Sequence, residues 1–318
     1  PNQMRFLLFI ILCFFSVNTS GQDIHFSQFK NAKLNLNPAL SASIESDFQA
    51  VLQRRSQWGS ITDPFKTISL SLYAKELYKQ FSFGTSFIND LAGSSNFTTS
   101  GINFSISKRI ALKNKSTLAL GGLVGAFQRS FDFNSLIFYD DEQFINENIF
   151  FIDLALGGIF EKQINNNSNF EFGLSLFHFN NPNQSFSDVY TQITPIKQLI
   201  YLQYDYLYNS MFFIPSIYYS IQDKERELLY GFDLSNNFND SKDKPYYTAA
   251  LYFRNKDAII PQLGIILKNI SFNISYDINI SELSKASNNY GGLEFSILYS
   301  WNTTNKKQQT KFKCPKYL

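Results

Sequence analysis

A strict two-residue alternation of apolar and polar side chains constrains the fold of this chain more than any other feature. Residues 269–280 read Asn-Ile-Ser-Phe-Asn-Ile-Ser-Tyr-Asp-Ile-Asn-Ile, so that every second residue is apolar. A helix would scatter these apolar side chains around its axis, whereas a strand places all of them on one face. The same alternation starts again at Ile102, Phe170, Leu228 and Leu293. The chain is therefore expected to fold mainly into strands with one apolar face.

The length and number of these segments predict an all-β fold, a transmembrane antiparallel β-barrel over 47–301. We expect about fourteen strands, each near the length that a tilted membrane-spanning strand needs. Their expected spans are 48–58, 66–75, 80–89, 99–109, 116–128, 150–162, 168–179, 198–208, 210–221, 226–236, 245–254, 258–268, 269–280 and 290–301. An even number brings both barrel ends to the periplasmic side. The two longest connections, about 130–149 and 181–197, then both lie outside the cell, where such barrels carry their long loops.

Alternation alone leaves a barrel and a soluble sandwich open, because a polar face suits either a wet lumen or solvent. Composition favours the barrel. Aromatic residues make up 17% of the chain, with 34 Phe and 18 Tyr, whereas charged residues make up only 17%. Aromatic girdles at the two membrane interfaces would use such a surplus. The net charge of +2 argues against a nucleic-acid-binding protein, which concentrates far more positive charge.

Three segments outside the barrel are expected. Residues 1–21 have the features of a cleavable secretion signal, with Met4 as the start, Arg5 before an apolar run and small polar residues after it. Residues 22–46 alternate poorly and are expected to be periplasmic or lumen-lying. Residues 302–318 form a basic periplasmic tail, which is either solvated or in contact with an anionic partner. No later apolar stretch has the length of a spanning helix, which leaves the periplasm, the outer membrane or the exterior for an exported chain. The barrel pattern then predicts the cell outer membrane.

Catalytic and metal-binding patterns are missing from the sequence. The only histidines are His25 and His178, and Cys314 is the only cysteine left after the signal. Two histidines and one cysteine do not make a zinc site, and no phosphate-binding glycine loop is present. His178 continues the apolar alternation of its segment, which predicts a residue at the membrane interface. We therefore expect neither an enzyme nor a cofactor or metal.

The first hundred residues carry motifs that identify a family. The chain reads Asp23-Ile-His-Phe-Ser-Gln-Phe29, then Leu34-Asn-Leu-Asn-Pro-Ala-Leu40, then Gln53-Arg-Arg-Ser-Gln-Trp58, and later Phe87-Ile-Asn-Asp90 before Ala92-Gly93. This order resembles the PorP/SprF family of the Bacteroidetes type IX secretion system, and Cys314-Pro315 resembles the family's C-terminus. Arg54-Arg55-Ser56 departs from the shorter Arg-Asn pair that is usual there. The resemblance implies as candidate partner-binding residues Phe26, Ser27, Gln28, Asn37, Pro38, Ala39, Arg54, Gln57, Trp58, Asn89, Asp90, Cys314 and Pro315.

The resemblance also implies a non-enzymatic role in secretion or surface anchoring of large adhesins, and in some relatives gliding motility. The implied partners are other secretion components, an adhesin or its C-terminal sorting domain, and outer-membrane lipid. Local structural explanations stay open for the same residues: Asn37-Pro38 makes a turn, Trp58 anchors a strand at the interface, and Asn89-Asp90 begins a loop with Gly93. The alternative function is a passive porin or a channel for hydrophobic solutes, because the expected lumen is polar.

Overall fold

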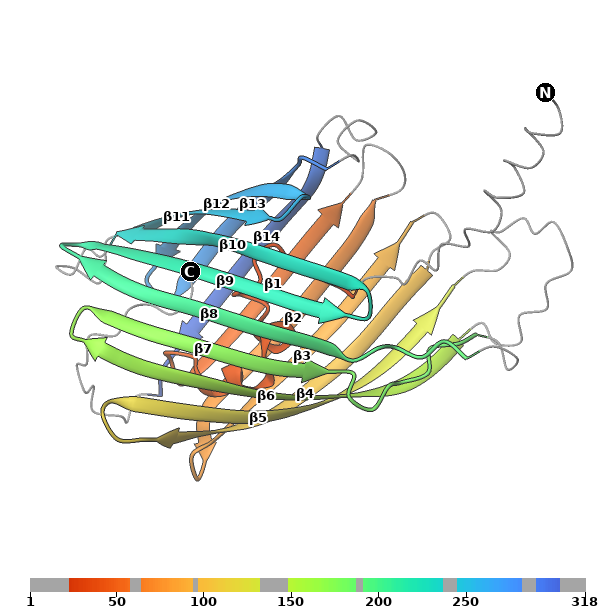
Figure 1. Ribbon diagram of the computed structural model, residues 1–318, viewed down its shortest axis with the longest axis horizontal. Coiled ribbons are helices and arrows are strands. Elements are labelled where there is room, and N and C mark those ends of the chain that lie inside the picture. Colours follow the sequence, from red (N-terminus) through yellow and green to blue (C-terminus); the bar gives the residue numbers. More distant parts are fainter. Residues whose placement is uncertain are drawn as a thin grey trace, which may run out of the picture.

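The computed structural model describes residues 23–57, 64–93, 97–131, 148–186, 191–236, 245–281 and 290–303. Within these residues, fourteen antiparallel strands form one closed barrel (Figure 1). The strands are β1 Phe48–Gln57, β2 Phe65–Tyr78, β3 Phe81–Ala92, β4 Phe97–Ala111, β5 Ser116–Ser130, β6 Asn148–Asn165, β7 Ser168–Phe177, β8 Lys197–Tyr208, β9 Met211–Gln222, β10 Glu225–Asn236, β11 Tyr246–Arg254, β12 Ala258–Leu267, β13 Ile270–Asn279 and β14 Tyr290–Trp301. The strand number and the barrel class expected from the alternation are confirmed.

The barrel closes between the first and last strands. β1 pairs with β14 without interruption from Phe48 opposite Trp301 to Gln57 opposite Gly292, and its other edge pairs with β2. Every other strand pairs with its two neighbours in sequence. Closure leaves no strand edge with unpaired amide groups, which is the condition for a sheet to cross a lipid bilayer.

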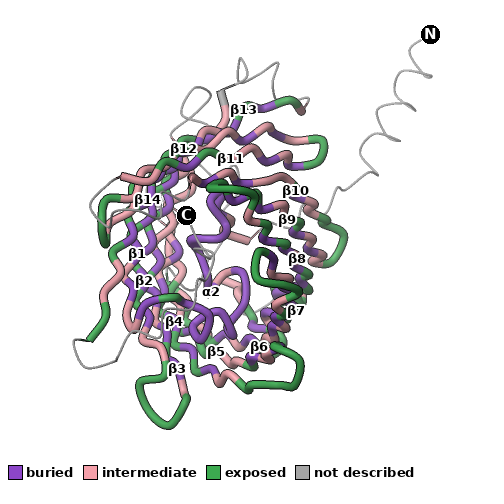
Figure 2. Tube along the Cα trace, turned by 90° about the vertical axis from the view of Figure 1, so that its left-hand side faces the viewer, coloured by how far each residue is buried: buried purple, intermediate pink, exposed green. Residues whose placement is uncertain are grey.

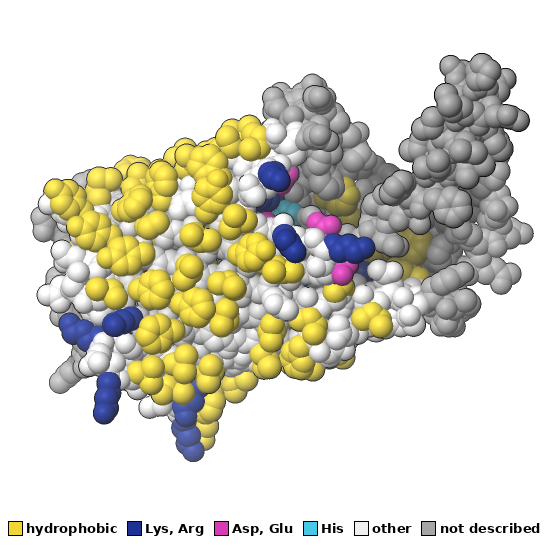
Figure 3. All heavy atoms as spheres, viewed as in Figure 1, with side chains coloured by type: hydrophobic (Ala, Val, Ile, Leu, Met, Phe, Trp, Pro, Cys, Tyr) yellow, Lys and Arg dark blue, Asp and Glu magenta, His cyan; other side chains and the backbone are white. Residues whose placement is uncertain are grey.

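The apolar side chains of the alternating pattern face the outside of the barrel, and the polar ones face the lumen. On β13, Phe272 and Ile274 are about two-fifths exposed on the outside (41% and 40%), whereas Asn273 and Ser275 are buried inside. On β2, Ile68 faces outward in the same way, between buried inward-facing neighbours. Figure 3 shows the resulting outer surface, where hydrophobic side chains cover the wall and lysines and arginines gather toward its ends. Such a surface suits contact with lipid.

The two ends of the barrel differ in their connections. The connections after β1, β3, β5, β7, β9, β11 and β13 meet at one end, here called the long-loop end, and include 131–147 and 178–196. The opposite, short-turn end carries two-residue turns such as Lys79-Gln80. The strand expected over 66–75 is longer in the structure: β2 continues to Tyr78 through a register shift, with Glu76 at a positive φ of 48°. The longer connection after β10 lies at the short-turn end, largely outside the described residues.

Among the described residues, helical structure is confined to a short piece of the N-terminal segment. α2 spans Lys33–Leu36, and a 3₁₀ turn, η1, spans Pro38–Ala42. In the part of the chain that the structure describes, no helix has the length and apolar character needed to cross a membrane.

Candidate functional site

The N-terminal segment, residues 23–47, lies inside the ring of strands. Figure 2 shows its buried trace around α2 within the barrel. Leu34, Leu36 and Leu40 are almost fully buried, and so is the ammonium-bearing side chain of Lys33, which donates to Gln49 at 2.6 Å. Burial in the lumen lowers the pKa of Lys33 to about 7, although the charges of nearby glutamates act in the opposite direction.

One half of this segment is attached to β5, β6 and β7 through Asn37, Pro38 and Ala39. The Asn37 side chain accepts from the Ala39 amide at 2.9 Å, which caps η1, while Pro38 occupies the first position of the turn. The side-chain nitrogen of Asn37, Nδ2, donates to the carbonyl oxygens of Gly158 (3.1 Å) and Leu174 (2.8 Å) in the barrel wall. Asn37 thus caps the 3₁₀ turn and also fixes the N-terminal segment to the barrel wall.

Two paired glycines make room for this attachment, and we call them the glycine seat. Gly121 on β5 lies opposite Gly157 on β6. A Cβ at Gly121 would come within 2.6 Å of the Ala39 nitrogen, and one at Gly157 within 2.0 Å of Asn37 Oδ1. Glycine is used here because another backbone approaches closely. These glycines were not among the residues predicted from the sequence, although the chain repeats Leu-Ala-Leu-Gly-Gly at 118–122 and 154–158.

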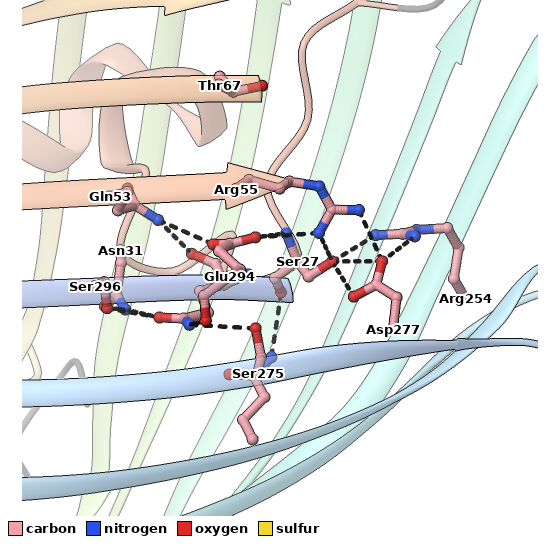
Figure 4. Close-up of polar contacts among 12 residues, drawn as sticks. Ser27, Asn31, Gln53, Arg55, Thr67, Arg254, Ser275, Asp277, Glu294 and Ser296 are labelled. Atoms are coloured by element: carbon pink, nitrogen blue, oxygen red, sulfur yellow. Dashed lines mark hydrogen bonds and ion pairs between the residues drawn. The ribbon is translucent and has the colours of Figure 1, made fainter. Parts of the chain in front are cut away.

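The other half of the segment is bound by an ionic network near the closing seam of the barrel (Figure 4). The Ser27 hydroxyl donates to Asp277 at 2.6 Å and accepts from Arg55 and Arg254. The backbone amide of Ser27 donates to Glu294 at 2.7 Å. Charge-assisted hydrogen bonds of this kind are roughly twice as strong as neutral ones.

Arg55 is the cation at the centre of this network, and its side chain is fully buried. Its guanidinium contacts Asp277 at 2.7 Å and Glu294 at 3.2 Å. Arg254 contacts the same Asp277 oxygen at 2.9 Å. Two arginines and two carboxylates therefore neutralise one another around a serine of the N-terminal segment.

Gln28 extends the network along the seam strands. Its backbone amide donates to Glu294 at 3.1 Å, and its side chain donates to Ser275 at 3.2 Å and accepts from Ser296 at 2.6 Å. The Gln53 side chain donates to Glu294 at 3.3 Å. The partners of Gln28 come from β1, β13 and β14, and Ser27 adds Arg254 at the end of β11. Ser27 and Gln28 therefore bind the wall roughly opposite the glycine seat, and the segment crosses the lumen.

An aromatic cluster lies between these two attachments. The Phe29 ring contacts the rings of Tyr201, Tyr218 and Tyr252 with centroids 6.2, 5.7 and 5.3 Å away. The neighbouring Lys30 forms an ion pair with Asp233. Edge-to-face aromatic contacts add to the burial of these rings, so the segment is also anchored on β8, β9 and β11.

The other predicted site residues are distributed differently. Phe26 is buried beside the aromatic cluster. Arg54 lies on the outer wall, because its position on β1 has the parity of exposed Leu52; the inward arginine is Arg55. Gln57 and Asp90 line the lumen at the long-loop end, where Asp90 accepts from Thr67. A last group lies outside the described residues: Trp58, Cys314 and Pro315.

Asn89 and Asp90 do not begin a loop, contrary to the expectation from the sequence. β3 continues to Ala92, and the turn follows at Gly93, whose φ is 67°. The Asn89 side chain donates to Ser100 on the neighbouring strand at 2.7 Å. The two adjacent residues therefore lie on opposite faces of one strand, and only Asp90 faces the lumen.

Above the N-terminal segment, a cavity of about 900 Å³ occupies the long-loop end of the lumen. We call it the vestibule. Its floor includes Asp23, Ile24 and His25 of the segment, and strands from around the ring supply its wall. Burial and the nearby Arg254 charge lower the pKa of His25 to about 4, so this histidine is neutral at physiological pH.

The end of the N-terminal segment that lies at the vestibule, Asp23, is held by His178, which lies between two carboxylates. His178 Nε2 lies 2.8 Å from Asp23 and Nδ1 lies 2.9 Å from Asp153. The expectation that His178 is an interface residue was wrong, because β7 ends at Phe177 and a positive φ of 57° turns the ring inward. Burial opposes the charged ring, but hydrogen bonds and the charges of Asp153 and Asp23 raise the pKa of His178 to about 9.

This histidine contact predicts a pH dependence. The stability that protonated His178 contributes is fully present below about pH 6.5, its unfolded pKa, and is lost as the pH rises through about 9. Between pH 7 and pH 10, hydrogen exchange at residues 23–26 should accelerate by roughly tenfold or more beyond the intrinsic pH effect. A His178→Gln variant should lack this step. Equal corrected protection of the native protein at both pH values would contradict the prediction.

The described residues offer no arrangement for metal binding. Among them, no group of three or more His, Cys, Asp or Glu side chains could hold a metal ion. The strongest polar constellation, the Arg55 network, is occupied by the chain's own segment. What this geometry can do is hold a segment across the lumen and leave a vestibule open above it.

Comparison with known proteins agrees with this architecture. The TodX monoaromatic hydrocarbon channel, as a deltaS2 mutant, has a TM-score of 0.52 and 9% identity, with 86% of this chain and 94% of that chain covered. A FadL homologue of Pseudomonas aeruginosa has a TM-score of 0.47 and 8% identity, with 84% and 93% covered. At 9% identity the likeness to TodX concerns the outer-membrane barrel fold alone. No curated protein sequence matches the chain.

The sequence itself matches a family. Residues 18–299 match the type IX secretion system membrane protein PorP/SprF. The match spans the N-terminal segment and nearly all of the barrel, including the motifs around Ser27, Asn37 and Arg55. The chain is thus an outer-membrane β-barrel and belongs to the PorP/SprF family of type IX secretion system membrane proteins.

Proposed function

We propose that this protein is a non-enzymatic component of the type IX secretion system that supports secretion or surface anchoring of adhesin-type cargo. Membership of the family implies other secretion components as partners. The finer role, with a large adhesin or its C-terminal sorting domain as partner, outer-membrane lipid around the barrel and a contribution to gliding motility, follows from the resemblance and is part of the proposal.

The observation that carries the proposal is the N-terminal segment held across the lumen. A general porin keeps an aqueous channel there. Here Ser27 is bonded to the β13–β14 side and Asn37 to the β6–β7 side, and both are almost completely buried. A barrel with an occupied lumen and a vestibule at one end is better suited to holding a partner than to passing solutes.

The orientation is also proposed. With the long-loop end outside the cell, the connections 131–147 and 178–196 and the vestibule face secreted cargo. The short turns then face the periplasm, as is usual for outer-membrane barrels. A signal peptide at 1–21 and a basic periplasmic tail at 302–318 are further parts of the proposal.

Deleting the gene tests the proposed role directly. We expect a deletion strain to lose surface display of one partner adhesin, measured by antibody labelling of intact cells, because the cargo has no component to hold it. Complementation with the native gene should restore display. Unchanged display in the deletion strain would contradict the proposal.

A passive channel for hydrophobic solutes is the second candidate, favoured by the aromatic side chains that line the vestibule. Conductance of the purified protein in planar bilayers, unchanged after removal of residues 22–46, would support the channel. A silent intact barrel that conducts only after this removal would instead support the proposed secretion role, because the segment would then be what closes the lumen.

A further inference from the structure

The vestibule is amphipathic, with its aromatic side chains on one part of the ring. All of the phenylalanines that line it come from β2–β7 and the connection that follows β7, and they include Phe97, Phe127 and Phe151. β8–β14 supply polar and charged residues instead, among them Lys197 and Arg254. Binding sites for small ligands commonly combine such an apolar wall with a few placed polar groups.

One cation, Arg129, lies within the aromatic part. It stands near the long-loop end of β5, and its guanidinium carbon lies 5.2 Å from the Phe97 ring centroid and 5.8 Å from that of Phe151. It donates to the Thr99 hydroxyl at 3.1 Å and to the Gln184 side-chain oxygen. Two rings and two neutral acceptors therefore hold a planar cation in position.

Arg129 differs from the other cations of the vestibule in its partners. Arg254 forms ion pairs with Asp277 and Glu227, and Lys197 lies 3.6 Å from Asp23. Within the described residues, no carboxylate lies within ion-pair distance of Arg129. Asp90, on the same wall, accepts a hydrogen bond from Thr67. A guanidinium held by aromatic rings and neutral acceptors, with the charges of Asp90 and Asp23 acting on it only from beyond ion-pair distance, keeps its donors available to an incoming anion.

We propose that the vestibule binds an apolar carboxylate, with Arg129 recognising the carboxylate group and the surrounding phenylalanines receiving the apolar part. Arginine presents a planar fork of N–H donors that matches a carboxylate. The cavity of about 900 Å³ has room for a ligand much larger than a single side chain. The carboxylate could belong to a free aryl or fatty acid, or to the C-terminus of a peptide that ends in an apolar residue.

Calorimetric titration of the purified barrel with four probes tests this proposal and identifies the source. The probes are phenylbutyrate, phenylbutyramide, the peptide Ala-Ala-Phe and its C-terminal amide. We expect at least one acid to bind and its amide to bind roughly tenfold or more weakly, because the amide removes the charge that Arg129 recognises. Binding of phenylbutyrate alone points to free acids, whereas preferential binding of the peptide points to polypeptide C-termini.

Variants then assign the binding to Arg129. Arg129→Gln should raise the dissociation constant roughly tenfold or more, and Arg129→Lys should recover only part of the affinity because lysine lacks the planar fork. Arg54→Gln removes the same charge from the outer wall and should leave binding unchanged. The proposal is overturned if neither acid binds at millimolar concentration, if acid and amide bind equally, or if folded Arg129→Gln binds as well as the native barrel. None of these results depends on the identity of the secreted cargo.

Discussion

Replacing Arg55 with methionine is expected to lower the free energy of unfolding of the barrel by about 3–5 kcal/mol. The fully buried Arg55 lies opposite Glu294 at the β1–β14 seam. Removing it leaves Glu294 without its cation in a place that water does not reach, whereas Asp277 keeps Arg254. Breaking a buried ion pair on one side costs more than replacing both partners, because the remaining charge stays desolvated.

Urea unfolding in detergent micelles measures this effect, and two further variants separate it from a general loss of structure. Arg54→Met makes the same chemical change on the outer wall and should shift stability by less than about 1 kcal/mol. The double variant Arg55→Met/Glu294→Gln should recover much of the loss, since no uncompensated charge remains. Equal destabilisation by Arg54→Met and Arg55→Met, or no recovery in the double variant, would contradict this account of the seam.

The strands were predictable because their signal is local. For β13, the alternation within residues 269–280 alone predicts both the strand and the side chains that face outward. The observed strand is Ile270–Asn279. Parity would also have separated the two arginines of β1: Arg55 shares the inward face of Gln53, and Arg54 shares the outward face of Leu52. The family motif pointed to Arg54, which the structure places on the outer wall.

The lumen contacts were not predictable in the same way because they join distant parts of the chain. Ser27 and Asp277 are 250 positions apart, and no periodicity relates them. His178 shows the limit of parity itself, since a single residue with positive φ at the end of β7 reverses the face that its position implies. Only the repeated Leu-Ala-Leu-Gly-Gly marked the glycine seat. Glycines that lie opposite each other on neighbouring strands indicate that another stretch of backbone packs closely against them.

Filling the glycine seat is the second change with a large expected effect. In Gly121→Ala the new methyl group would lie 2.6 Å from the Ala39 nitrogen and 2.7 Å from the Ala39 Cα. These are backbone atoms, which cannot rotate away as a side-chain tip can. In Gly157→Ala it would lie 2.0 Å from Asn37 Oδ1 and 2.8 Å from the Pro38 ring. We expect each variant to cost about 1–3 kcal/mol of stability through overpacking, and the double variant to displace the segment from β5 and β6.

The adjacent glycines supply matched controls on the same two strands. A methyl group at Gly122 would lie 3.7 Å from Leu156, and one at Gly158 would lie 3.4 Å from Leu120, both ordinary contacts. Gly122→Ala and Gly158→Ala should therefore be neutral or slightly stabilising, because alanine loses less backbone entropy than glycine. Hydrogen exchange over residues 33–42 is the measurement, since it reports the segment separately from the strands. Loss of protection there, in a barrel that remains folded, would show that the lumen segment and the wall are separable units. Unchanged protection in the double variant would mean that the ionic network at Ser27 alone is enough to hold the segment.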